Sequence, residues 1–234
     1  MFTNPDFLQV VANSFQYMAL TVVSTLLLAL LLALFLKKNT RINAILQSAI
    51  FAPYVISFVS VSFIWMWMMD SSYGLLNFLL NLIHVPSVRW LEDPKVAIYS
   101  LVLVAIWKGV GYNTIIFISG LQSIPTYLYE AASLDGAKPA GVFFKITLPM
   151  LSPTSFFLTL VNIISSFKVF ETISIMTKGG PMNSTNTLVY YLYEYGFVYY
   201  KIGYASSVGV VLMVIIGILT ILYFKVLSTN VHYR

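Results

Sequence analysis

Five long apolar stretches dominate the sequence and constrain its fold more than any other feature. They cover residues Ala19–Leu36, Ala44–Met69, Ala97–Leu121, Thr154–Met176 and Gly203–Phe224. A helix needs about 20 apolar residues to cross the hydrocarbon core of a bilayer. The sequence therefore predicts an all-α polytopic membrane protein with five transmembrane helices.

The composition excludes the other broad classes of protein. Hydrophobic residues make up 59% of the 234 residues and charged residues only 9%, which rules out a soluble enzyme and a disordered chain. The net charge of +5 is too small and too dispersed for a nucleic-acid surface. Because the chain has no Cys and its two histidines, His84 and His232, are isolated, we expect no metal site.

The distribution of basic residues predicts the side of the membrane on which each loop lies, because cytoplasmic loops carry an excess of Lys and Arg. One side collects Lys37, Lys38, Arg41, Lys138, Lys145, Lys225 and Arg234, and the other holds Arg89, Lys95, Lys178 and Lys201. The first side is therefore expected to be cytoplasmic. This arrangement places the C-terminus inside and the N-terminus outside.

Two connecting segments on the external side are rich in apolar and aromatic residues. Between Ser71 and Lys95, apolar residues fall largely on one face of a short helix, which we expect to lie in the outer interface. Between Thr177 and Lys201, a Gly-Gly-Pro turn precedes seven Tyr and Phe residues. These aromatics are interpreted either as a membrane-boundary belt or as an outward surface for docking or substrate stacking.

The cytoplasmic segment 122–149 predicts a helix, a turn and a second amphipathic turn. Ser123 is a candidate cap for a helix that begins at Pro125, and Gly136 supplies the break. Pro149 marks the return to the membrane. Such a protrusion suits the groove of another protein, and a connector lying on the inner leaflet is the alternative.

The same segment carries seven fixed residues at fixed spacing, namely Glu130, Ala131, Ala132, Gly136, Ile146, Leu148 and Pro149, with Asp135 directly before the glycine. This EAA-x3-G-x9-I-x-L-P pattern resembles the membrane subunits of binding-protein-dependent ATP-binding-cassette importers. Further stretches resemble the carbohydrate-importing branch, which includes permeases of the maltose and glycerol-3-phosphate type: Ile124-Pro125, Ser166–Glu171, Met176–Pro181 and Thr187. Glu171 departs mildly from the branch, where Asp is more usual.

The resemblance implies a type I importer fold, with residues 1–234 forming one permease domain and segment 122–149 acting as its coupling loop. Glu130 and Asp135 would make polar contacts with the ATPase, Ala131 and Ala132 would allow close approach, and Gly136 would provide the bend. Family members usually have six spans, so the resemblance also leads us to expect a further span upstream of Met1.

The resemblance also implies partners: a second, homologous permease subunit forming a heterodimer, two cytoplasmic ATPase subunits, and an extracellular solute-binding protein. The whole complex would lie in the bacterial cell membrane. ATP and Mg²⁺ would bind the ATPase subunits and no cofactor would bind this chain, which has no phosphate-binding GxxxxGK[ST] loop.

Ionisable and amide side chains within the predicted spans are candidates for function, because they are costly in lipid. Lys168 and Glu171 are three residues apart, so we expect them to lie on one helical face, where they can neutralise each other. The alternative is that they line a substrate path together with Asn162. Lys108 and Asn113 in the third span either line the same path or pack against polar groups of a neighbouring helix.

The main hypothesis is a permease subunit that forms part of the path for a sugar or oligosaccharide. A phosphorylated polyol such as glycerol 3-phosphate is the alternative solute, with Lys168 or Lys108 facing the anion. An intramembrane enzyme using Lys168 and Glu171 as acid and base is a hypothesis from another class, as is a purely structural assembly protein. We expect this chain to be a non-catalytic subunit.

Overall fold

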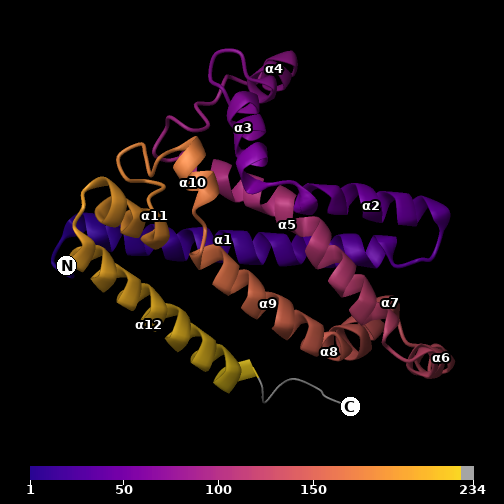
Figure 1. The fold of residues 1–234 in the computed structure, drawn as a ribbon. Coiled ribbons are helices and arrows are strands. Elements are labelled where there is room, and N and C mark those ends of the chain that lie inside the picture. The colour runs from indigo at the N-terminus through magenta and orange to yellow at the C-terminus, as the bar shows by residue number, and fades with distance from the viewer. Residues whose placement is uncertain (228–234) are drawn as a thin grey trace.

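The computed structural model describes residues 1–227, and its regular elements are helices throughout that range (Figure 1). The helices are α1 (Pro5–Leu36), α2 (Arg41–Val55), α3 (Phe58–Met68), α4 (Leu75–Leu82), α5 (Ala97–Gln122), α6 (Thr126–Leu134), α7 (Pro139–Val142), α8 (Leu148–Met150), α9 (Ser152–Phe167), α10 (Glu171–Met176), α11 (Leu188–Tyr193) and α12 (Ile202–Leu227), with π-helical turns η1 (Phe143–Thr147) and η2 (Glu194–Val198). The predicted all-α class is confirmed. His232 and Arg234 lie outside the described residues.

Within residues 1–227, four helical segments are long and apolar enough to cross a membrane, and the pair α2 and α3 makes a fifth when counted together. Figure 1 shows α1 running from the N-terminus, α2 returning beside it, and α9 running against the direction of α5 and α12. Helix α1 packs mainly on α5 and α9, α2 packs on α5, and α11 packs on α12. This is the alternating path expected of a polytopic chain.

The first span begins earlier than the sequence predicted. Helix α1 starts at Pro5 rather than Ala19, because the Asn4 side chain accepts a hydrogen bond from the Asp6 amide at 2.9 Å and proline suits the first helical position. The polar residues Asn13 and Ser14 interrupt the apolar pattern, but both are buried by protein. Hydropathy alone therefore placed the start of this span too late.

The second span is broken, so the expectation of one continuous helix over Ala44–Met69 was wrong. Helices α2 and α3 meet at 99°. Ile56 between them has extended backbone angles, and the Ser57 hydroxyl accepts a hydrogen bond from the Val59 amide as the cap of α3. Pro53 contributes no amide hydrogen to the last turn of α2, which weakens that turn.

The fourth span is interrupted at residues 168–170. Helix α9 ends at Phe167, Lys168 follows as its C-cap, and α10 begins at Glu171 after Phe170, which has non-helical backbone angles. Lys168 and Glu171 therefore do not share a helical face, and no ion pair joins them in the described structure. Of the two alternatives, mutual neutralisation is therefore not supported, because it required both residues to lie on one helix.

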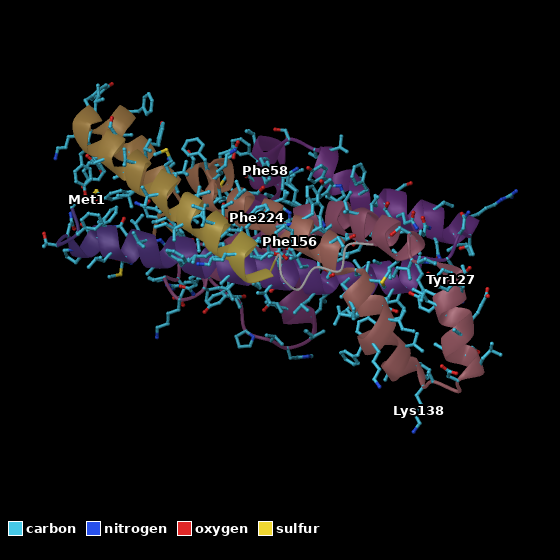
Figure 2. The ribbon with its side chains drawn as sticks, turned by 90° about the horizontal axis from the view of Figure 1, so that it is seen from below. Met1, Phe58, Tyr127, Lys138, Phe156 and Phe224 are labelled. Carbon is cyan, nitrogen blue, oxygen red and sulfur yellow. The ribbon has the colours of Figure 1, made fainter. Side chains whose placement is uncertain are left out.

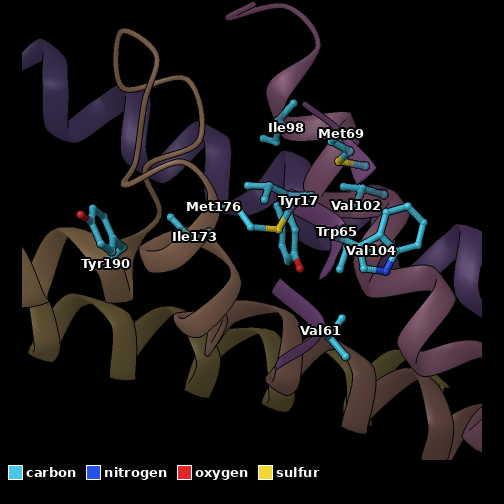
Figure 3. Packing of buried hydrophobic residues seen from close by; sticks show 11 residues of the cluster. Tyr17, Val61, Trp65, Met69, Ile98, Val102, Val104, Ile173, Met176 and Tyr190 are labelled. Atoms are coloured by element: carbon cyan, nitrogen blue, oxygen red, sulfur yellow. The ribbon is translucent and has the colours of Figure 1, made fainter. Parts of the chain in front are cut away.

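The main apolar core lies where α1, α3, α5 and α10 meet (Figure 3). Tyr17, Trp65, Val104 and Met176 are among its buried members. Helix α3 packs against α10, so the parts of the two interrupted spans that follow their breaks support each other. Helix α12 is different, because only 6% of its most apolar window is buried within this chain.

The two external segments are ordered by polar contacts. The predicted short helix is confirmed as α4, and the buried Asn77 accepts hydrogen bonds from the Val88 amide and the Trp90 indole, both at 3.0 Å. In the second segment the Gly-Gly-Pro turn is present. Its aromatics are divided, since Tyr190 and Tyr191 are buried while the three last rings are exposed, namely Phe197, Tyr199 and Tyr200. Tyr200 is the most exposed of them, at 80%.

The segment that carries the EAA motif projects from the rest of the chain, with Lys138 at its tip (Figure 2). Helix α6 begins at Thr126 with Pro125 as its N-cap, so the predicted start at Pro125 was one residue early. Ser123 belongs instead to the end of α5, where its hydroxyl donates to the Gly120 carbonyl at 2.8 Å. Gly136 ends the turn with φ +66°, a conformation that favours glycine.

Candidate functional site

A cavity of about 350 Å³ lies between α1, α5, α9 and the two helix breaks. Its wall includes all five residues predicted to line a path: Lys108, Asn113, Asn162, Lys168 and Glu171. The structure thus brings together side chains that are up to 63 residues apart in the sequence.

One side of the cavity is aromatic. The rings of Tyr54 and Tyr112 are stacked, with centroids 4.7 Å apart and planes 13° from parallel, and Phe58 and Tyr17 also line the wall. Tyr17, Tyr54 and Phe58 were not among the predicted site residues. Pro53 was the available signal, because a proline within a span marks a possible break beside which side chains can reach a cavity.

Two amides link α5 to α9 at the cavity wall. The Asn162 Nδ2 donates to the Asn113 Oδ1 at 2.7 Å, and the Asn113 Nδ2 lies 3.4 Å from the Asn162 Oδ1. Each Nδ2 also donates to a carbonyl one turn earlier in its own helix, that of Gly109 or Leu158. The pair therefore connects the two helices through side-chain amides, which are also groups that form hydrogen bonds with polar solutes.

Lys108 reaches across from α5 to the break between α2 and α3. Its ammonium donates to the carbonyl oxygens of Pro53 and Tyr54, each at 3.1 Å, and to that of Ile56. The ammonium also lies 4.3 Å from the centre of the Phe58 ring. Lys108 is only 3% exposed, and its three donors are all used, so it packs against a neighbouring helix as well as lining the cavity.

Lys168 and Glu171 are held differently. Both side chains are exposed and line the cavity beside the break in the fourth span. Over residues 1–227 neither side chain forms an ion pair or hydrogen bond with the rest of the chain. The cavity therefore contains one cation and one anion that are available to a solute.

The residues of the EAA motif lie far from this cavity, on and after α6. Four residues of the motif region are exposed, namely Glu130, Ala131, Asp135 and Gly136, whereas Ala132 is buried with only 8% of its surface exposed. Leu134 on the same helix is 90% exposed, so its side chain is almost entirely uncovered by the rest of this chain. After the bend, Ile146 and Pro149 are partly buried and Leu148 is 37% exposed.

A second hollow, of about 370 Å³, lies between the end of α1 and the segment from α6 to η1. Its lining includes Leu34 and Lys37 from the end of α1, and Tyr129, Ser133 and Phe143 from the segment. Beside it, the Tyr129 and Thr147 hydroxyls are 3.2 Å apart. No group of three His, Cys, Asp or Glu side chains in residues 1–227 is arranged to hold a metal ion.

Residues 25–233 match the family described as the binding-protein-dependent transport system inner membrane component. The chain belongs to this family. The resemblance first carried by the EAA motif is thereby confirmed, as is the type I importer fold. The chain is thus a multi-pass membrane permease by family.

Curated relatives cover nearly the whole chain. A permease protein of the sn-glycerol-3-phosphate transport system, UgpA of Pectobacterium atrosepticum, is 33% identical over 100% of this chain and 79% of its own length. The probable ABC transporter permease protein YesP of Bacillus subtilis is 35% identical over 100% and 77%. The arabinooligosaccharides transport system permease protein AraP of Halalkalibacterium halodurans is 34% identical over 93% and 70%.

Solved structures show the same fold. A chain of a bacterial alginate ABC transporter, crystallised with a periplasmic protein bound to an alginate pentasaccharide, aligns with a TM-score of 0.86 at 24% identity, over 96% of this chain and 79% of that one. A chain of the MetNI methionine ABC transporter aligns with a TM-score of 0.69 at 14% identity, over 97% of both chains. These likenesses support the fold alone.

Proposed function

We propose that the chain is a permease subunit of an ATP-driven importer and that the cavity binds a neutral sugar or oligosaccharide during its passage. The observation that carries this proposal is the stacked Tyr54–Tyr112 pair beside the Asn113–Asn162 amides. Aromatic faces pack against the C–H faces of sugar rings, while amides both donate to and accept from hydroxyl groups. The permease relative named for arabinooligosaccharides supports the same solute class.

A phosphorylated polyol is the second candidate solute. The unpaired ammonium of Lys168 in the cavity favours it, because a phosphate needs a cationic partner, and relatives named for sn-glycerol 3-phosphate support it. Glu171 in the same cavity opposes it, since its carboxylate repels a phosphate and leaves the two free charges balanced.

The EAA motif and the distribution of basic residues support the partners and the orientation that we propose. Segment 122–149 seats in a cleft of a cytoplasmic ATPase, with the exposed Leu134 as an apolar anchor and Glu130 and Asp135 as polar contacts. The N-terminal end faces outward, where a solute-binding protein delivers the solute, and the C-terminus is cytoplasmic in a bacterial inner membrane. A second, homologous permease covers the apolar face of α12, two ATPase subunits bind ATP and Mg²⁺, and this chain is non-catalytic.

The experiment is ATP hydrolysis by the reconstituted four-subunit complex, with its binding protein loaded in turn with neutral oligosaccharides and with sn-glycerol 3-phosphate. Neutral oligosaccharides are expected to stimulate hydrolysis. Stimulation by glycerol 3-phosphate alone would establish the second candidate. Stimulation by no solute, in a complex that still hydrolyses ATP, would refute transport by this chain.

A further inference from the structure

The break between α2 and α3 creates a hydrogen-bonding problem that the chain must solve. The last four carbonyls of a helix lack partners within it, and in a bilayer each unsatisfied carbonyl costs several kcal/mol. Helix α2 ends at Val55, and the extended Ile56 offers no continuing turn. The carbonyls of Pro53, Tyr54 and Ile56 therefore need donors from elsewhere.

Lys108 supplies those donors from a different helix. Its ammonium has three N–H groups, and the three carbonyls that accept from it all belong to the break. A positive charge at this position also suits the negative end of the α2 dipole. The contact thus joins the middle of α5 to the bend in the second span.

The same contact fixes the aromatic wall of the cavity. Tyr54 belongs to the last turn of α2 and Phe58 to the first turn of α3, on either side of the Lys108 ammonium. The ammonium lies 4.3 Å from the Phe58 ring centre and 6.0 Å from that of Tyr54. Moving the two helix ends apart would move these rings apart as well.

We infer that Lys108 is a positioning residue, which holds the α2–α3 break bent and keeps Tyr54 and Phe58 aligned as one wall of the cavity. This inference depends on the proposed function only where it predicts an effect of Lys108 substitutions on transport. The bend itself can be measured without solute. Lys108→Met keeps an unbranched side chain that is one heavy atom shorter and removes all three donors, so it is the informative variant.

The bend is measured by spin labels at Ile42→Cys and Ile64→Cys in the assembled complex, since the chain has no Cys of its own and both positions are exposed. From the helical rise of about 1.5 Å per residue, the two backbones are roughly 22 Å apart across a 99° bend and roughly 33 Å apart in a straight helix. Lys108→Met is expected to lengthen and broaden the distance distribution. Lys95→Met, in an exposed loop, is the matched control and is expected to change nothing.

A transport measurement separates positioning from general damage. Lys108→Met is expected to raise the KM for the stimulating solute about tenfold, the equivalent of one lost contact, while the maximal rate changes much less. Lys108→Arg keeps donors at the break and is expected to restore the short distance in part, which provides a folded variant should Lys108→Met fail to assemble. A wild-type distance in either variant that lacks donors, Lys108→Met or Lys108→Leu, would overturn the inference. The distance is measured without solute, so an unchanged distance would contradict the role of Lys108 at the bend and would leave the proposed function of the cavity unaffected.

Discussion

Asn113 and Asn162 hold each other across the α5–α9 crossing, with the Asn162 Nδ2 donating to the Asn113 Oδ1 at 2.7 Å. Hydrogen bonds between membrane helices contribute only about 0.6 kcal/mol on average. Both residues line the cavity, so exchanging this bond for bonds to the hydroxyl groups of a bound solute would cost little.

The first prediction tests this pair. Asn162→Ala is expected to raise the KM for the solute about tenfold, because one hydrogen bond to a polar group is lost, and to change stability little. Uptake by the reconstituted complex provides the measurement. Thr220→Ala in α12 is the control, because Thr220 lines neither of the two hollows described above. Equal KM values for both variants would exclude a role for Asn162 in binding.

The second prediction concerns the crossing of α2 and α5. A Cβ added at Gly111 would lie 1.9 Å from the Ile50 carbonyl oxygen, so Gly111→Ala must push the helices apart. We expect a loss of about 1–3 kcal/mol in the free energy of unfolding, measured as a lower thermal midpoint in detergent. Gly217→Ala is the matched control, since a Cβ there meets nothing within 4 Å. Equal midpoints would show that this crossing is not tightly packed.

The third prediction concerns the turn of the EAA segment. Gly136→Val forces a branched residue into φ +66°, at a cost of about 1–3 kcal/mol that the local turn relieves by changing shape. ATP hydrolysis is expected to continue while solute uptake falls, because the segment no longer transmits movement between subunits. Gly141→Ala, where a Cβ has open space, is expected to retain coupling. Unchanged uptake in Gly136→Val would refute the coupling role.

The fourth prediction is a pH dependence in the external segment. Burial raises the pKa of Glu194 above its usual range, and the hydrogen bond from Asn186 at 2.8 Å only partly offsets this. The folded chain then binds this proton more tightly than the unfolded chain, so the stability contributed by the protonated form is lost as the pH rises through the raised pKa. Glu194→Gln should remove that loss, giving a higher thermal midpoint near neutral pH but not in acid. Glu92→Gln serves as the control, and the same pH profile for wild type and Glu194→Gln would contradict the prediction.

The sequence was sufficient for the class of fold, because long apolar runs have few alternatives to transmembrane helices. It was insufficient for the breaks, since Ile56 and residues 168–170 are apolar or lie within apolar runs, and their backbone is set by caps and by packing of α3 on α10. That is why Lys168 and Glu171 were placed on one helical face. The five candidate path residues were nevertheless brought to one cavity, since intramembrane polar groups tend to share the protein interior.

The aromatic wall of the cavity could not be predicted from the sequence, for a related reason. Tyr54 and Phe58 look like ordinary span residues until the 99° bend turns them toward Lys108. Seeing that contact requires the geometry of two helices whose contacting residues are more than 50 positions apart.

The isolation of Lys168 and Glu171 bears on how such a chain can change its cargo. Within residues 1–227 neither side chain forms a hydrogen bond or an ion pair with the rest of the chain. Both positions are therefore open to substitution, in evolution or in the laboratory, with little effect on folding. Lys108 lacks this freedom, because its ammonium donates to three carbonyls of the α2–α3 break. A new solute preference is therefore most accessible at positions 168 and 171, where the selectivity of the cavity can be rewritten while its scaffold stays the same.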